Sequence, residues 1–145
     1  MTIAIGSDHA GFDLKEKVRT ILQDLGHGVI DYGTHNKDSV DYPDFGLKVA
    51  RAVAGGEVDW GIAICWTGSG MTIAANKVKG IRAVLALNKD MAFYARSHND
   101  ANVLTLSGKY TDEKEIRSIL TTWLETDFEG GRHVKRVEKI TGAES

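Results

Sequence analysis

The sequence contains one cysteine, one proline and no long hydrophobic run among its 145 residues. A single cysteine cannot form a disulfide within the chain, so the core alone must stabilise the fold. The apolar runs are far shorter than the roughly 18 to 20 residues that a membrane-spanning helix needs. The N-terminus also lacks the pattern of a signal peptide. We therefore expect a cytoplasmic protein without membrane contacts.

An excess of charge of one sign is also missing, because 18 Lys and Arg residues stand against 20 Asp and Glu, for a formal net charge of -2. No segment gathers positive charge into a stripe that could follow a nucleic-acid backbone, so we expect no nucleic-acid partner. With 42% hydrophobic residues, the 145-residue chain is typical of one globular domain spanning residues 1–145.

Glycine is abundant, and most of the 16 glycines fall where a β-prone run would pass into a helix. The spacing of apolar residues predicts strands at 2–5, 29–30, 60–65, 81–87 and 102–106, alternating with helices at 14–25, 43–53, 71–77, 89–97, 112–123 and about 131–141. This alternation predicts an α/β fold with an open, mostly parallel five-stranded sheet and helices on both faces.

Ligands of such folds bind beyond the carboxyl ends of the strands. The rule directs attention to the loops at 6–11, 65–70 and 98–99. In the first loop, Asp8 and His9 lie between two glycines and could both point at a ligand. The alternative is that Asp8 caps the following helix and His9 lies on the surface.

The second loop begins at Cys65, which ends an apolar strand, and continues through Trp66, Thr67, Gly68, Ser69 and Gly70 into a helix. It lacks the Gly-Lys-Ser/Thr of a Walker loop, and Ile73 occupies the third glycine position of a dinucleotide fingerprint. The remaining interpretation of this loop is a binding site for an oxyanion or a sugar hydroxyl. Cys65 is either a small buried hydrophobe or a nucleophile or base whose thiolate a helix N-terminus would stabilise.

Several further residues have two interpretations each. His98 and Asn99 could bind a ligand or belong to a turn, and Tyr42 could stack on a sugar or pack in the core. Arg132 and Arg136 lie four residues apart, on one face of a helix, where they could clamp a phosphate or form a solvated basic face. The five histidines show no paired ligand spacing, so no metal is expected.

Taken together, eight motifs resemble the ribose-5-phosphate isomerase B family of sugar-phosphate isomerases over nearly the whole chain. They are GSDHAG at 6–11, DYP at 41–43, AGGEVD at 54–59, CWTGSGM at 65–71, AANK at 74–77, GIRA at 80–83, HNDAN at 98–102 and FEGGRH at 128–133. The resemblance implies a Rossmann-like three-layer α/β/α sandwich without metal or cofactor. It also implies a homodimer or tetramer whose active sites are shared between subunits, with the C-terminal helix packing at the subunit interface.

The resemblance also implies a role for each candidate residue in the interconversion of ribose 5-phosphate and ribulose 5-phosphate, a step of the pentose phosphate pathway. Cys65 matches the base that moves a proton between C2 and C1 through a cis-enediolate. His98, from the second subunit, matches the acid that opens the furanose ring. Thr67 matches a residue that handles protons at the hydroxyls, and the backbone from Trp66 to Gly70 matches the segment that binds the enediolate oxygen. Asp8, His9 and Asn99 match residues that bind the sugar. Arg132 and Arg136 match the pair that binds the phosphate.

Two positions differ from the family pattern. Trp66 stands where a small residue is common, and Lys109 stands where many members carry a phosphate-binding arginine. Because of the indole, another sugar phosphate is an alternative substrate: allose 6-phosphate, galactose 6-phosphate or a tetrose 4-phosphate. A non-catalytic sugar-phosphate sensor and a nucleotide-binding module are alternatives from other classes. The presence of base and acid in one chain favours a homo-oligomer over paired paralogous subunits.

Overall fold

A computed structural model describes residues 1–144, so the last residue of the expected domain, Ser145, lies outside the described residues. Its centre is a five-stranded parallel sheet in the order β2-β1-β3-β5-β4. The strands are β1 (Thr2–Ser7), β2 (Gly28–Asp31), β3 (Trp60–Cys65), β4 (Ala83–Leu85) and β5 (Val103–Ser107). Because β3 lies at the middle of the sheet, it is apolar on both faces, as the sequence predicted.

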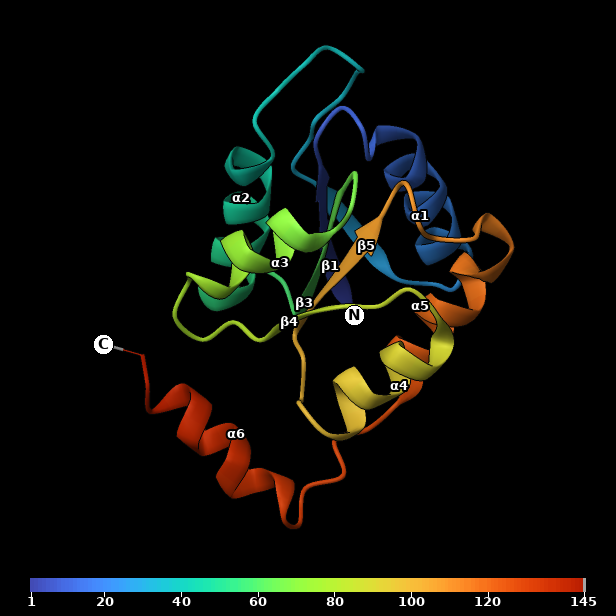
Figure 1. Cartoon of the computed structure of the whole chain (residues 1–145). Coiled ribbons are helices and arrows are strands. Elements are labelled where there is room, and N and C mark those ends of the chain that lie inside the picture. Colours follow the sequence, from blue (N-terminus) through green and yellow to red (C-terminus); the bar gives the residue numbers. More distant parts are fainter. Residues whose placement is uncertain (145) are drawn as a thin grey trace.

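Helices cover both faces of the sheet (Figure 1). They are α1 (Phe12–Asp24), α2 (Tyr42–Ala54), α3 (Ser69–Asn76), α4 (Lys89–Ser97), α5 (Ile116–Glu125) and α6 (His133–Thr141), with a 3-10 turn, η1 (Glu113–Glu115), before α5. Helices α1, α4 and α5 pack on one face, α2 and α3 on the other, and α6 extends away from the sheet. The arrangement confirms the predicted three-layer α/β/α fold.

Alternation along β1 and β3 assigns side chains to the two faces. Ile3 and Ile5 point into the core beneath α1 and α5, while Ala4 points toward α2. Small residues on the second face let α2 approach closely, because a Cβ built on Gly61 would lie 2.5 Å from Val49 Cγ1. This close approach determines where the first residue of α2, Tyr42, meets the end of β3.

Most predicted boundaries hold within two residues. The exception is the helix predicted at 112–123, where the 3-10 turn η1 comes first and α5 begins only at Ile116. Gly26 ends α1 as predicted: it has φ +88°, and the amide of His27 donates to the carbonyl of Leu22. Asp112 caps η1 through a bond from the Lys114 amide. Within residues 1–144, no helix combines the length and apolarity needed to span a membrane.

Candidate active site

A pocket of about 220 Å³ opens at the carboxyl edge of the sheet, where β3 ends. Cys65 lies at its base: it is the last residue of β3, pairs with Ser107 of β5 and is 4% exposed. Asp8, Tyr42, Trp66, Thr67 and Gly70 complete the lining. Residues from three separate motifs therefore meet around one thiol, and the loops at 6–11 and 65–70 lie where the carboxyl-edge rule predicts.

The turn from Cys65 into α3 depends on two glycines. Gly68 has φ +86°, and a Cβ there would lie 2.5 Å from Leu85 Cδ1. A Cβ on Gly70 would lie 2.5 Å from the ring of Tyr42. Side chains at either position would strain the backbone or displace Tyr42, so the glycines bring the start of α3 against the pocket. Tyr42 is thereby held at the pocket instead of in the core.

Asp8 is buried, and its Oδ1 accepts a hydrogen bond from the amide of Gly11, 2.9 Å away. This bond closes the turn before α1 and does not cap the helix, whose N-cap residue is Gly11 without a side-chain cap, so the capping interpretation is wrong. Asp8 also lines the pocket. His9 is half-buried, and its Nδ1 accepts from the amide of Val40 at 3.2 Å. His9 therefore anchors the 33–41 loop that leads to Tyr42; it is not a free surface residue.

The backbone at Trp66 is fixed by the end of β5. Its carbonyl accepts from Ser107 Oγ at 2.8 Å and from the amide of Lys109 at 2.9 Å. The indole is 51% exposed and packs over Gly108, where a Cβ would lie 3.6 Å from the ring. Lys109 shares this edge, but its Nζ lies over the ring of Tyr110, 5.1 Å from the centroid. Ser69 and Thr67 are exposed, and Thr67 Oγ1 accepts from the Ser69 amide.

The expectation that His98 and Asn99 lie at the carboxyl edge is wrong. They follow α4 and precede β5, so they lie at the amino ends of the strands. The four residue steps from Val103 to Ser107 separate the two edges by about 13 Å. The rule was applied to a helix-to-strand junction, and in a parallel sheet such junctions all lie at the edge opposite the strand-to-helix loops.

Two arginines hold this helix-to-strand junction in a rigid shape. Asp100, with φ +48°, receives Arg96 Nη1 on Oδ1 at 2.8 Å and Arg82 Nη2 on Oδ2 at 3.3 Å. Arg82 Nε also donates to the carbonyl of Asn99 at 3.0 Å. These charge-assisted bonds offset the energetic cost of the left-handed backbone at Asp100. Sequence reasoning missed both arginines: Arg82 reaches Asp100 from 18 residues away, and Arg96, two residues before the motif, binds a turn whose geometry the sequence does not show.

His98 forms a cluster with two residues that were not predicted as site residues. Its ring stacks on His133, with centroids 4.2 Å apart and planes 19° from parallel. Glu129 Oε2 lies 3.9 Å from His98 Nε2 and 3.8 Å from His133 Nε2. Burial lowers the pKa of His133, and the charges of His98 and Arg132 lower it further. His133 is therefore neutral at pH 7.

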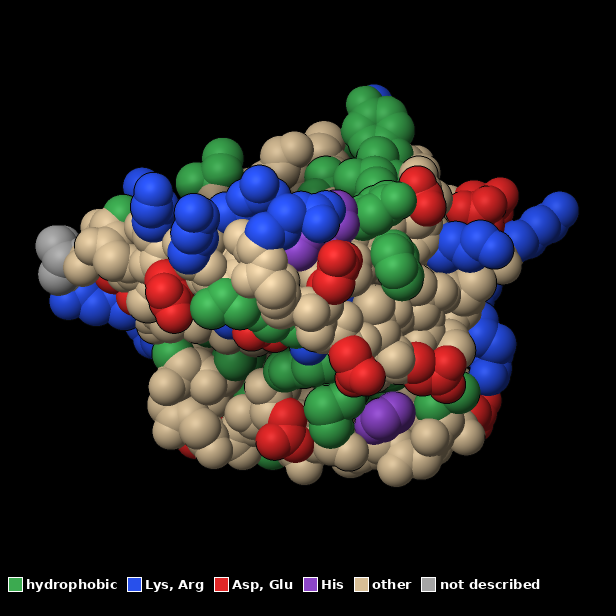
Figure 2. Space-filling view, turned by 90° about the horizontal axis from the view of Figure 1, so that it is seen from below, with side chains coloured by type: hydrophobic (Ala, Val, Ile, Leu, Met, Phe, Trp, Pro, Cys, Tyr) green, Lys and Arg blue, Asp and Glu red, His purple; other side chains and the backbone are tan. Residues whose placement is uncertain are grey.

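Arg132 and Arg136 are exposed at the start of α6, beside this cluster, where both act on His133. Figure 2 shows Lys and Arg side chains gathered in a band next to a histidine on the face seen from below. The structure thus brings the phosphate-clamp candidates close to His98. It does not bring any of these residues to Cys65.

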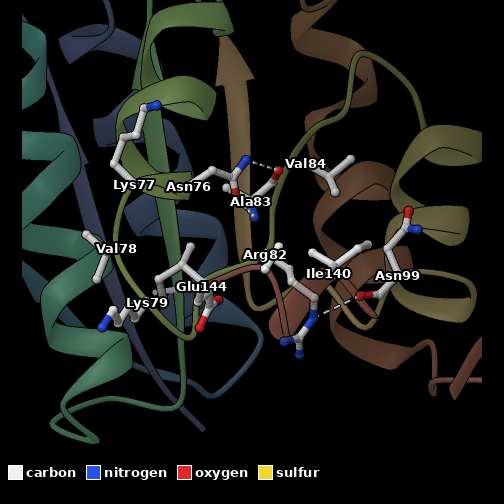
Figure 3. Close-up of a pocket in the computed structure, with 12 residues that line it drawn as sticks. Asn76, Lys77, Val78, Lys79, Arg82, Ala83, Val84, Asn99, Ile140 and Glu144 are labelled. Carbon is white, nitrogen blue, oxygen red and sulfur yellow. Dashed lines mark hydrogen bonds between the residues drawn. The ribbon is translucent and has the colours of Figure 1, made fainter. Parts of the chain in front are cut away.

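A larger hollow of about 620 Å³ lies at the amino edge, between the α3–β4 connection and α6 (Figure 3). Its lining includes Arg82, Asn99 and Ile140, and it contains no catalytic candidate other than Asn99. Glu144 Oε1 accepts from the amide of Gly80 at 3.0 Å and joins α6 to this side of the molecule. Although this hollow is larger, the chemistry of a thiol base belongs to the pocket at Cys65.

One group of side chains in residues 1–144 has ligand atoms close enough to share a metal ion: His98, Glu129 and His133, all within 4.8 Å of one another. The histidine spacing could not indicate this group, because the two rings come from different helices. Arg132 and Arg136 beside it oppose the binding of a cation.

Comparison with known proteins identifies relatives that match almost the whole chain. The family model described as Ribose/Galactose Isomerase matches residues 3–140. Ribose-5-phosphate isomerase B of Escherichia coli is 48% identical over 142 residues, covering 98% of this chain and 95% of the relative.

Solved structures agree with these sequence matches. Clostridium thermocellum ribose-5-phosphate isomerase B is 53% identical with a TM-score of 0.97, covering 99% of this chain and 97% of that one. The Mycoplasma genitalium enzyme, solved with bound ribulose-5-phosphate, is 42% identical with a TM-score of 0.94, covering 99% and 95%.

Proposed function

The chain belongs to the ribose/galactose isomerase family, and we propose that it interconverts ribose 5-phosphate and ribulose 5-phosphate. It is an aldose–ketose isomerase, as its relatives over nearly the full length are. The observation that carries the choice of sugar is the bound ribulose-5-phosphate in the Mycoplasma genitalium relative. The pocket at Cys65 supports the reaction type.

In the proposed reaction, the Cys65 thiolate removes the proton from C2 of the open-chain aldose. The electron pair of the C2–H bond forms a C1–C2 double bond, and the carbonyl oxygen becomes the negative oxygen of a cis-enediolate. Cys65 then returns the proton to C1 while the proton on O2 passes to O1, which leaves a ketone at C2. A thiol at the end of a buried strand suits this role because little water reaches it.

The start of α3 is the proposed site for the enediolate oxygen. The first amides of a helix have no intrahelical partners, and the helix dipole favours negative charge there. Gly68 and Gly70 let this backbone lie against the pocket, next to the thiol. Thr67 lines the same pocket, where its hydroxyl would exchange protons with O1 and O2.

His98 is the proposed acid for ring opening. The C1–O4 bond of the furanose breaks, O4 takes a proton from the imidazolium, and the anomeric hydroxyl releases its proton to solvent as the aldehyde forms. Asn99 follows His98 in the chain, Arg132 and Arg136 lie close to the adjacent His133, and these three residues would hold the sugar and its phosphate. Asp8, Tyr42 and His9 would contact the sugar from the Cys65 side.

These two sets of residues lie at opposite edges of one sheet, so we propose that a second copy of the chain completes each active site. Cys65 of one copy would then face His98 of the other. Exposed apolar residues on α4 and α6, among them Tyr94, Val134 and Ile140, support a subunit contact at the amino edge. Dimers and tetramers both satisfy this requirement.

The exposed indole of Trp66 favours one second candidate, the same chemistry on a hexose 6-phosphate. Because the ring packs over Gly108 and half of it is exposed, it adds a wall without filling the pocket.

The test is turnover by the purified protein, without added metal, of ribose 5-phosphate, allose 6-phosphate, galactose 6-phosphate and erythrose 4-phosphate. The highest kcat/KM is expected for ribose 5-phosphate. A clear preference for a hexose phosphate would transfer the proposal to that sugar, and turnover of none would favour a sugar-phosphate sensor.

A further inference from the structure

The imidazole of His98 is confined by its neighbours. The ring of Tyr94, one turn earlier in α4, lies 4.7 Å away, with the planes tilted by 54°. The ring of His133, from α6, stacks on His98 with centroids 4.2 Å apart. A ring packed against two others has few torsion angles available, so these contacts determine where Nδ1 and Nε2 point.

Glu129 is fixed relative to His98 by the backbone. Its amide donates to the carbonyl of Ser97 at 3.0 Å, which attaches the segment after α5 to the end of α4. Its carboxylate, 3.8 to 3.9 Å from Nε2 of both histidines, is too far for a hydrogen bond but close enough to attract a protonated ring. At His133, the charge of Glu129 raises the pKa and so opposes the lowering by Arg132 and Arg136.

The turn after Glu129 brings His133 back over His98. Gly130 and Gly131 have φ +70° and +54°, and the His133 amide donates to the carbonyl of Gly130 at 3.0 Å. Two consecutive left-handed residues suit glycine, because any other residue there would be strained. His133 ends up buried, and within the described chain its Nε2 has no hydrogen-bond partner. A buried polar atom without a partner destabilises the fold, so a role in the site would explain its presence.

We propose that Glu129 and His133 are positioning residues that hold the His98 imidazole at the angle needed to open the furanose ring; this inference rests on the proposed function. Neither residue needs to touch the sugar. The stacked ring of His133 determines the plane of His98, and the carboxylate of Glu129, 3.9 Å from His98 Nε2, determines which way that nitrogen points.

Two measurements on one enzyme separate ring opening from isomerisation. Ribose 5-phosphate is mostly a furanose, so its turnover needs the ring to open. Ribulose 5-phosphate has no ring, because its C5 oxygen carries the phosphate and cannot attack C2. Exchange of its C1 proton with deuterium from solvent therefore requires the base and the enediolate but not the ring-opening acid.

The variants are Glu129→Gln, His133→Ala and His133→Phe, with Glu138→Gln on α6 as the control for the lost charge. Glu129→Gln and His133→Ala are expected to lower kcat/KM for ribose 5-phosphate about tenfold or more, while C1 exchange in ribulose 5-phosphate stays within about twofold. His133→Phe keeps a stacked ring and should lose less than His133→Ala. Glu138→Gln should leave both rates at the wild-type level.

A His98→Asn background supplies the second readout. If Glu129 acts through His98, Glu129→Gln should cause almost no further loss there. Three results would each overturn the positioning role. The first is an equal loss in turnover and exchange, the second is a full additional loss in the His98→Asn background, and the third is unchanged turnover in all three variants. If the wild-type protein neither turns over ribose 5-phosphate nor exchanges the C1 proton, the proposed function itself fails.

Discussion

The two edges of the sheet hold their candidate residues by different means. At the carboxyl edge, the backbone does the positioning: Gly68 and Gly70 allow close approach, and Trp66 is fixed through its carbonyl. At the amino edge, side chains position one another: two arginines hold Asp100, and His133 stacks on His98. Both arrangements join distant segments, because Ser107 lies 41 residues from Trp66 and His133 lies 35 residues from His98.

This difference explains how the proposed chemistry is divided. A base that works on a carbon needs a dry, enclosed position, which the end of a central strand offers. An acid that opens a ring, and a pair of arginines that bind phosphate, need access to solvent and to a partner chain. Parallel strands place these two environments about 13 Å apart, the length of four residue steps.

The largest effect on the reaction rate is expected from a substitution at the carboxyl edge. Cys65→Ala removes the proposed base, so proton exchange at C2 of ribose 5-phosphate should fall by about 10²- to 10⁴-fold. Sugar-phosphate binding, measured by calorimetry, should remain, because the phosphate contacts lie at the other edge. Exchange at the wild-type rate in a folded Cys65→Ala protein would remove Cys65 from the mechanism.

Mixing two inactive variants tests whether the edges of different chains meet. After subunit exchange, Cys65→Ala and His98→Ala homodimers should regain about a quarter of wild-type activity, because half of the dimers carry one intact site of two. Mixing Cys65→Ala with a Cys65→Ala/His98→Ala double variant is the control and should recover none. If labelled subunits exchange but activity does not return, each site lies within a single chain.

A smaller effect is expected at Trp66, which lines the pocket at the carboxyl edge. Trp66→Gly should change the ratio of kcat/KM between allose 6-phosphate and ribose 5-phosphate by about tenfold, the usual scale for reshaping an apolar wall. Tyr110→Ala removes another exposed ring from the same edge but outside the pocket, so it should leave the ratio unchanged. An unaltered ratio in Trp66→Gly would mean that the indole does not select the sugar.

The smallest effect concerns stability at the amino edge. Burial keeps the pKa of His133 below its ordinary value, so the unfolded chain binds a proton there that the folded chain does not. The free energy of unfolding should therefore decrease as the pH falls below about 6.5, the ordinary histidine value. Urea unfolding at fixed protein concentration should show a weaker decrease in His133→Asn than in the wild type. Parallel curves would mean that His133 is protonated in the folded protein.

Sequence reasoning predicted the carboxyl edge better than the amino edge. Periodicity predicted the helices around 43–53 and 89–97 and the central strand at 60–65, and the carboxyl-edge rule predicted that the loops of Asp8 and Cys65 lie at one edge. The rule did not indicate Tyr42, which the structure adds to this pocket. The rule does not apply to His98, because His98 lies between a helix and the following strand, and such junctions of a parallel sheet lie at the amino edge. Sequence reasoning missed four supporting residues: Glu129, His133, Arg82 and Arg96. The first three act on partners that are far away in sequence, and Arg96 binds a turn whose shape is known only from the structure.

The sequence by itself determined the alternation of strands and helices, the positions of the glycine turns and the family resemblance, because these depend on local spacing and on short motifs. Only the tertiary structure decided that His98 stacks on His133 and that Arg82 reaches Asp100. Such placements depend on strand order and on contacts between distant segments, and local residue patterns do not encode them.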